Sequence, residues 1–389
     1  MKKISADLIL PVEGSPIKNG IIIVDETGEI IDIQQEKKHQ KSPEVTYYSG
    51  IIVPGFINAH NHLEYAYAKD LIDQGQKLPG FIKSIVQIKQ EVPADYQMIE
   101  QADRDMYEWG TVAVGDQTNT LITKDVKAKS KIYYHSFIEL YQAIGEINDS
   151  LTDFRHGQVY LTAFNNQGSI VPHAPYSVGP DLLKIIAYEA FMRRWPVSIH
   201  NQETESEADM FRYGKGDLYE LFRSRKTPQP WIPTGTSSLQ WYLPFFRDSH
   251  NLLLIHNTYT SKEDIYFAEN THKRLFWVMC PNSNLYIEKR LPDIPVFVEN
   301  NCTICLGTDS YASNTSLNIL EEMRTLQENF EIPFEKLLEW ATINGARALN
   351  LDHIFGSITP GKRPGLVLLQ NIDPDKKSLS PQVKIKRII

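Results

Sequence analysis

The chain has 389 residues, of which 42% are hydrophobic and 23% are charged, and its formal net charge is −8. This length exceeds one small domain and suits a large barrel with an accessory domain. The composition is typical of a globular protein, and the negative charge argues against binding to nucleic acid or to an anionic membrane surface.

The cysteine count indicates a reducing environment. The three cysteines are Cys280, Cys302 and Cys305, and an odd, low count argues against a disulfide framework. The apolar run at the N-terminus is broken by Asp7 and Pro11, so it is too short for a signal sequence. No stretch approaches the length of a membrane span. We therefore expect a cytoplasmic protein.

Both ends of the chain are predicted to be β. Near the N-terminus, strands are expected over 20–25 and 29–33, with a turn between them. Near the C-terminus, a turn over 356–361 precedes a strand expected over 366–370. We expect the two ends to meet as one small β-sandwich.

Between these ends, short apolar runs alternate with helical patterns. Apolar residues at three- and four-residue spacing predict helices over 181–195 and 317–330. Strands are expected over 111–116, 132–137, 197–200, 252–256, 275–279 and 302–307. This alternation predicts an α/β fold with a (β/α)8 barrel of the TIM type. We expect the barrel over 53–350, with the sandwich built from 1–52 and 351–389. The proline-rich segment 227–235 is expected to be an ordered surface loop.

The first barrel strand ends in a histidine pair. Residues 54–64 read Pro-Gly-Phe-Ile-Asn-Ala-His-Asn-His-Leu-Glu, an apolar run that leads into His60 and His62. Side chains two apart on a strand face the same way, about 6–7 Å apart. Two imidazoles converging at the end of a buried strand favour a site for one divalent metal ion.

Other polar residues also follow apolar runs. His173, His200, His256 and Asp309 each stand where an expected strand ends. In a (β/α)8 barrel, functional side chains gather at the C-terminal ends of the strands. Three histidines and an aspartate suit Zn²⁺ or Fe²⁺ with one position open for water, and zinc lowers the pKa of bound water to about 7.

The same pattern suggests catalytic roles. Asp309 could bind the metal and also orient or deprotonate the water, and His256 could polarise the attacked centre. Glu203, three residues after His200, could move a proton to the substrate nitrogen, a role typically worth about 10²–10⁴-fold in rate.

Several other residues are expected to be structural. Glu205 and Glu207 are interpreted as a solvated helix start, and Asp116 as a capping or barrel-rim residue. His135 and His250 have no chemical context in the sequence.

These residues and their order resemble the aminohydrolase (deaminase and chlorohydrolase) branch of the amidohydrolase superfamily. The similar segments are Pro54–His62, Pro172–Val178, His200–Glu207, Cys280–Leu285, Leu306–Asn314, Ala341–Leu349 and Gly356–Arg363. The resemblance implies one metal ion, zinc first with iron as the alternative, held by His60, His62, His200 and Asp309. It further implies that Glu203 moves the proton, that His256 assists the hydroxide and that His173 contacts the substrate. No lysine stands where the binuclear branches carry a carboxylated one, which favours a mononuclear site.

A finer resemblance concerns the aminodeoxyfutalosine deaminases, which remove the 6-amino group of an adenine nucleoside. It rests on residues 62–64 and 75–82, and it implies that Glu64 hydrogen-bonds a ribose hydroxyl or a base nitrogen. Tyr65 and Ala66 depart from the pattern of these enzymes, where Leu-Ser is usual.

The predicted function is the hydrolytic deamination of an amino-substituted N-heterocycle, with an adenine-type nucleoside such as aminodeoxyfutalosine as the favoured substrate. The alternatives are another ring (guanine, 8-oxoguanine, a pyrimidine or a triazine) or a non-catalytic, metal-containing barrel that binds a ligand. Fold analogy suggests a homodimer. The segment 65–93 is the candidate lid over the site.

Overall fold

The computed structural model describes residues 1–35, 44–142, 149–223, 233–248 and 250–389. Most of the proline-rich segment 227–235 lies outside these residues. Strands from both chain ends form one seven-stranded sheet in the order β15-β14-β5-β1-β3-β4, with β2 paired to β1. Its strands are β1 (Lys2–Ile9), β2 (Ile17–Lys18), β3 (Gly20–Val24), β4 (Ile30–Gln35), β5 (Val45–Pro54), β14 (Leu366–Gln370) and β15 (Lys384–Arg387).

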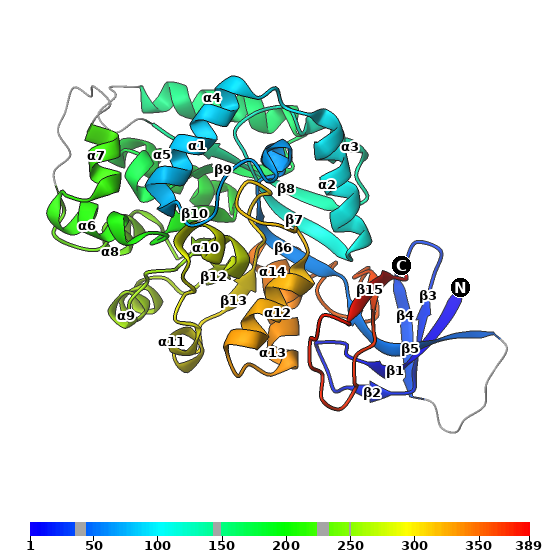
Figure 1. Cartoon of the computed structure of the whole chain (residues 1–389). Helices are drawn as coiled ribbons and strands as arrows, with labels where there is room; N and C mark the ends of the chain where they lie inside the picture. The colour runs from blue at the N-terminus through cyan, green and yellow to red at the C-terminus, as the bar shows by residue number, and fades with distance from the viewer. Residues whose placement is uncertain (36–43, 143–148, 224–232, 249) are drawn as a thin grey trace.

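The two chain ends meet where β14 runs antiparallel to β5. Ile52 lies opposite Leu368 in this ladder, and both belong to the hydrophobic core of the sheet. Both termini lie in this unit, beside the barrel (Figure 1). The expectation that the ends combine in one β unit is confirmed, while the boundaries at 52 and 350 stay predictions.

The middle of the chain forms a barrel of eight parallel strands. In order they are β6 (Phe56–Asn61), β7 (Thr111–Thr118), β8 (Tyr133–Leu140), β9 (Gly168–Pro172), β10 (Val197–Asn201), β11 (Leu252–His256), β12 (Leu275–Met279) and β13 (Ile304–Leu306). Consecutive strands pair from β6 to β9 and from β10 to β13. Nearly all of their residues are buried, as expected for parallel strands covered on both faces. The predicted TIM-type barrel is therefore confirmed.

Backbone hydrogen bonds close the barrel at its two seams. His200 N–H donates to His173 O at 2.9 Å, which joins the end of β9 to β10. Thr308 N–H and Asp309 N–H both donate to His60 O at 3.0 Å, which joins the end of β13 to β6. Residues of the candidate site therefore lie on both seams.

Helices surround the barrel strands (Figure 1). They are α1 (Lys77–Glu91), α2 (Tyr96–Glu108), α3 (Lys124–Lys129), α4 (Ser150–Ala163), α5 (Pro180–Arg193), α6 (Glu205–Tyr213), α7 (Asp217–Arg223), α8 (Ser238–Tyr242), α9 (Lys262–Thr271), α10 (Pro281–Glu288), α11 (Ile294–Glu299), α12 (Ile319–Asn329), α13 (Phe334–Ala341) and α14 (Ile343–Ala348). The helices predicted over 181–195 and 317–330 correspond to α5 and α12. The proline at the first position of α5 explains its start, because proline is favoured there.

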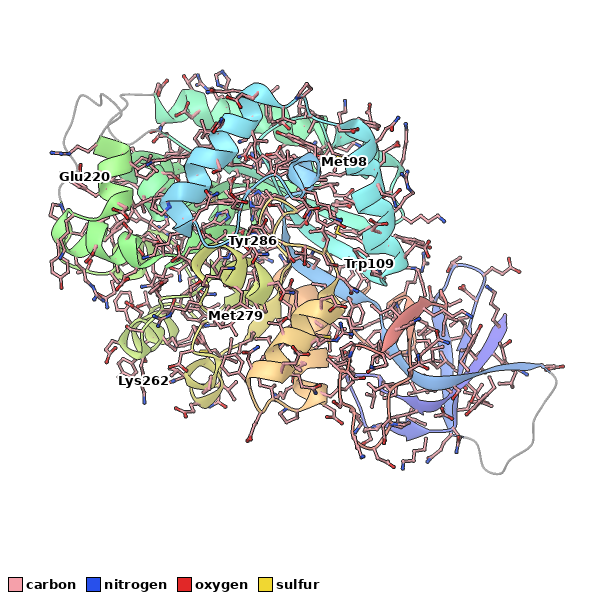
Figure 2. The ribbon with its side chains drawn as sticks, in the orientation of Figure 1. Met98, Trp109, Glu220, Lys262, Met279 and Tyr286 are labelled. Carbon is pink, nitrogen blue, oxygen red and sulfur yellow. The ribbon has the colours of Figure 1, made fainter. Side chains whose placement is uncertain are left out.

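The barrel and the β unit share a packed interface. Ile51, Val53 and Val367 of the sheet belong to the same hydrophobic cluster as the barrel core. Arg387 of β15 donates to the carbonyls of Tyr107 and Thr111 at 3.0 Å each. Side chains fill the gaps that the ribbons leave (Figure 2), and Trp109 marks the end of α2. None of the described helices is long and apolar enough to cross a membrane.

Candidate active site

The four predicted metal ligands lie together at one end of the barrel. His60 ends β6 with His62 just after it, His200 lies on β10, and Asp309 follows β13. Their residues are 0%, 7%, 6% and 6% exposed, respectively. This is the C-terminal end of the strands, where barrel enzymes carry their active sites.

The donor atoms of these residues converge. His62 Nε2 lies 3.4 Å from His200 Nε2, and Asp309 Oδ1 lies 3.7 Å from both His60 Nε2 and His62 Nε2. Donor atoms around a tetrahedral zinc ion with bonds of 2.0–2.1 Å stand about 3.3–3.4 Å apart. The spacing therefore fits one ion of this size.

The protonation of the histidines also fits a metal ion. Burial lowers the pKa of His60 to about 4 and that of His62 to about 3, so both rings are neutral at neutral pH. His60 Nε2 is buried and has no hydrogen-bond partner among the described residues. His200 donates its Nδ1 proton to His173 O at 2.8 Å, which leaves the Nε2 lone pair for a metal.

Asp309 is held so that one oxygen faces the histidines. Ser283 and Ser313 donate to Oδ2 at 2.7 and 2.6 Å, while Oδ1 faces His60 and His62. Burial alone would raise the pKa of Asp309, but the neighbouring imidazoles hold it well below its usual value. Asp309 is therefore ionised and able to bind a cation.

The close approach of β13 to β6 requires glycine at position 307. A Cβ atom on Gly307 would lie 2.7 Å from the Cβ of His60 and 2.9 Å from His60 O. Any side chain there would push Asp309 away from the histidine pair, because the N–H of Asp309 bonds to His60 O.

Glu203 and His256 form a second pair beside this cluster. Glu203 Oε1 lies 3.7 Å from His256 Nε2. Burial, together with the charge of Asp309, raises the pKa of Glu203 well above its usual value. Burial lowers the pKa of His256 to about 3 and keeps it neutral. His256 also has a left-handed backbone (φ 74°), and such strain in a non-glycine residue clusters at functional sites.

Glu207 positions the loop that carries Glu203. Its carboxyl accepts the N–H groups of Gln202 at 3.2 Å and of Glu203 at 3.3 Å, and the hydroxyl of Ser238 at 2.5 Å. Glu207 is fully buried, so the interpretation as part of a solvated helix start is wrong. The loop folds back over the first turn of α6, where an acidic side chain satisfies free N–H groups.

A cavity of about 710 Å³ opens onto these groups. Its polar wall contains His62, His173, His200, Glu203, His256 and Asp309, and its apolar wall is the face of α1 with Leu78, Phe81, Ile82, Ile85 and Val86. The volume is typical of a site for a small molecule. The segment expected to act as a lid therefore supplies one wall of the cavity. His173 directly follows β9, and its Nδ1 lies 2.7 Å from Ser177 Oγ.

The structure does not bring Glu64 into this cavity. After His62 the chain turns into a short helix, η1 (Leu63–Ala68). The Glu64 carboxyl accepts hydrogen bonds from the Thr120 hydroxyl at 2.7 Å, the Thr120 N–H at 3.0 Å and the Asn119 N–H at 3.2 Å. It is absent from the cavity lining, so its position does not support the predicted contact with substrate.

Glu139 lines the cavity instead, a position that was not predicted from the sequence. It stands near the end of β8 and accepts a hydrogen bond from Asn119 Nδ2 at 3.0 Å. The strand predicted over 132–137 continues to Leu140, because Ile138 is also buried and pairs with Ile170 of β9. Extending that strand would have placed Glu139 at the end of the third barrel strand.

Asp116 secures the chain around the histidine pair. It accepts the side-chain N–H of Asn61 at 2.7 Å and the backbone N–H of Leu63 at 2.8 Å, and it pairs with Lys127 at 2.7 Å. These contacts agree with the structural role predicted for this residue.

The known proteins that are similar to this chain include several deaminases. An adenosine deaminase from Helicobacter pylori is 26% identical over 356 residues, which cover 89% of this chain and 86% of the relative. A 5-methylthioadenosine/S-adenosylhomocysteine deaminase from Halalkalibacterium halodurans is also 26% identical, over 85% of this chain and 74% of the relative. The solved structure of Helicobacter pylori aminofutalosine deaminase in complex with methylthio-coformycin has the same fold, with a TM-score of 0.86 at 22% identity over 100% of both chains.

A match to a protein-family model shows which family the chain belongs to. The model of the Amidohydrolase family, whose members are metal-dependent hydrolases, matches residues 51–389, a span that contains the whole barrel and every predicted site residue. The chain therefore belongs to the Amidohydrolase family.

Proposed function

We propose that the protein is a metal-dependent aminohydrolase that removes the amino group of an adenine-type nucleoside and releases ammonia. The observation that carries this proposal is the buried carboxyl of Glu203, which stands 3.7 Å from His256 in the same cavity as the predicted metal ligands. A barrel that only binds a ligand would gain nothing from a carboxyl group buried beside His256 and the predicted metal ligands.

The substrate class is proposed from the cavity and from the relatives. The apolar face of α1 opposite a polar wall suits a flat heteroaromatic ring with polar edges. The relatives named above are deaminases of adenosine, methylthioadenosine and aminofutalosine. Aminodeoxyfutalosine is the specific candidate within this class.

His60, His62, His200 and Asp309 would hold one divalent ion. Zinc is the first candidate, because nitrogen and carboxylate donors at this spacing suit tetrahedral coordination, and iron is the alternative. When bound, such an ion supplies Lewis-acid polarisation and lowers the pKa of a water molecule to about 7.

Side chains of the protein would accept and donate the protons of the reaction. A C–O bond replaces the C–N bond at the ring carbon, one proton of the water ends on the departing ammonia, and the other stays on the ring. Asp309 Oδ1 would accept a proton from the water, since Oδ2 is engaged by two serines. Glu203 would donate to the leaving nitrogen. His256 would orient the water through Nε2, and His173 would contact the ring.

The direct test is ammonia release by the purified, zinc-loaded protein. The substrate panel contains aminopurine bases and nucleosides, aminodeoxyfutalosine, guanine and an aminotriazine. We expect release from at least one adenine nucleoside, and we expect a chelator to abolish it. Ammonia release from the triazine or guanine alone would contradict the substrate class. If protein with one metal ion per chain released ammonia from none of these substrates, the aminohydrolase proposal would be contradicted.

A further inference from the structure

Glu139 is a buried carboxylate that accepts one hydrogen bond from the described residues. It is 5% exposed and lines the cavity. Asn119 Nδ2 donates to Oε2 at 3.0 Å, whereas Oε1 accepts no hydrogen bond from the described residues and lies 3.4 Å from His200 Nδ1. Within the described part of the chain, no lysine or arginine nitrogen lies within 4.0 Å of this carboxylate. Oε1 therefore keeps lone pairs available to a molecule in the cavity.

The neighbouring imidazoles do not turn Glu139 into a second metal site. Donor atoms of Glu139, His173 and His200 lie within 4.8 Å of one another. However, the nitrogen of His200 on this side is Nδ1, and its proton already goes to His173 O at 2.8 Å. A protonated nitrogen cannot bind a metal ion, so the group lacks its third ligand.

The chemistry of an adenine nucleoside limits what can meet Glu139. A carboxylate only accepts hydrogen bonds, so its partner must be an N–H or O–H donor. The ring nitrogens N1, N3 and N7 of such a nucleoside are acceptors. Its exocyclic amino group is the leaving group and must face Glu203. The sugar hydroxyl groups are the donors that remain.

The order of the strands places these contacts in a line. Glu203 follows β10, His173 follows β9, and Glu139 stands near the end of β8, so the three stand at the ends of consecutive strands around the barrel mouth. A ring that presents its amino group to Glu203 and passes His173 brings its sugar toward Glu139. Glu64, the carboxylate predicted for this role, is engaged by Thr120 and Asn119 outside the cavity.

We propose that Glu139 accepts hydrogen bonds from the sugar hydroxyl groups of the substrate and thereby selects ribonucleosides over their deoxy forms. This inference rests on the proposed deaminase function. It assigns the sugar-binding end of the cavity to β8 rather than to the segment after β6.

The test removes the sugar hydroxyl groups and the Glu139 carboxylate, first separately and then together. Deamination of adenosine and of 2′,3′-dideoxyadenosine is compared in the wild type and in Glu139→Gln. Hydrogen bonds to a charged acceptor predict that the wild type loses about ten- to a hundredfold in kcat/KM when the hydroxyls are removed. We expect Glu139→Gln to lower kcat/KM for adenosine by the same factor. For the dideoxy substrate, we expect Glu139→Gln to lower kcat/KM by no more than about threefold relative to the wild type, because the effects of removing two groups in contact are not additive.

Two controls separate this role from a structural one. Glu263→Gln makes the same change on the exposed face of α9 and should keep the wild-type preference for the ribonucleoside. Metal content is measured for each variant, and Glu139→Gln should keep one ion per chain. An equal loss on both substrates, with or without loss of metal, would assign Glu139 to orienting His200 and overturn the proposal. Loss of the ribonucleoside preference in Glu64→Gln but not in Glu139→Gln would also overturn it.

Binding of purine riboside and its 2′,3′-dideoxy form, measured by calorimetry, keeps the two proposals distinct. Binding that depends on both the hydroxyls and Glu139, without turnover of any aminopurine, would support Glu139 and reject the deaminase. Turnover without a hydroxyl preference in the wild type would support the deaminase and reject the role of Glu139. Neither binding nor turnover would reject both.

Discussion

Glu203 is the residue whose removal should separate chemistry from binding. Gln has the same shape but carries no transferable proton, so we expect Glu203→Gln to lower ammonia release at least about a hundredfold while the metal content stays at one ion per chain. The matched control is Glu205→Gln, because Glu205 is exposed two residues away. Full activity in Glu203→Gln would show that another group moves the proton.

Glu322 should make stability depend on pH. It is fully buried and accepts hydrogen bonds from Asn282 N–H at 2.9 Å and Asn314 Nδ2 at 2.8 Å. Burial raises its pKa from 4.5 to about 8 in the folded chain. The folded state then binds one proton more than the unfolded state between these values, so its contribution is complete below pH 4.5 and is lost as the pH rises to about 8.

Replacement of Glu322 by Gln removes this titration. Each pKa unit corresponds to about 1.4 kcal/mol, so we expect the wild type to lose a few kcal/mol more stability than Glu322→Gln between pH 5 and pH 8. Denaturant melts of both proteins at several pH values measure this difference. Parallel stability curves would mean that Glu322 is ionised in the folded state throughout.

The positions of the predicted ligands were predictable because they depend on where strands end, while their roles stay predictions. His60, His62, His200 and Asp309 follow apolar runs, and in a barrel all such ends meet at one face. Glu64, Glu139 and Glu207 depend instead on how loops turn after the strands. Glu64 and Glu207 both follow a strand-end histidine closely, yet both bind loop N–H groups rather than the cavity. Local sequence patterns carry little information about such turns.

At the scale of elements, the close contact between β13 and β6 leaves no room for a side chain at position 307. A methyl group at Gly307 would overlap His60, and overpacking of this kind typically costs 1–3 kcal/mol. We expect Gly307→Ala to lower the melting temperature and to weaken metal binding. Thermal melts and metal titration measure both effects. Gly157→Ala in α4 is the control, because its new methyl would meet only side chains, at 3.3 Å or more. Wild-type metal affinity in Gly307→Ala would show that the seam can relax without moving Asp309.

Element positions followed the apolar runs, while element ends did not. The strand predicted over 252–256 is β11, with the same bounds. The strand predicted over 302–307 is limited to Ile304–Leu306. Gly307 N–H makes a last bond to β12, at Met279 O, and the N–H of Thr308 already bonds to His60 O instead. Strand ends depend on partners far along the chain, which local hydrophobicity does not reveal.

For the whole molecule, the metal ion should act as a stabilising ligand. The four proposed ligands come from β6, β10 and the end of β13, and thus from both four-stranded sheets of the barrel. An ion that binds only the folded state adds about 2.7 kcal/mol at a hundred times its Kd. We expect a chelator to lower the melting temperature by a few degrees and added zinc to restore it. The variant Asp309→Ala should show a smaller shift. An unchanged melting temperature after complete metal removal would mean that the ion contributes nothing to closing the barrel.

The architecture of the whole chain was accessible from its sequence because its two ends and its middle have different periodicity. Short strands with turns occur at both ends, and regular β–α alternation fills the middle. The pairing of β5 with β14 connects residues more than three hundred positions apart, and the sequence could suggest it only through the shared β character of both ends.

The barrel seam at His60 and Asp309 also has a consequence for biosynthesis. The ribosome releases His60 and His62 early, but almost the whole barrel must emerge before Asp309 can reach His60 O. A nascent chain therefore exposes an incomplete ligand set for most of its synthesis, and two histidines hold a metal ion far more weakly than four donors. Metal loading is thus expected to follow chain completion, so the bound ion would mark those molecules whose first and last barrel strands have met.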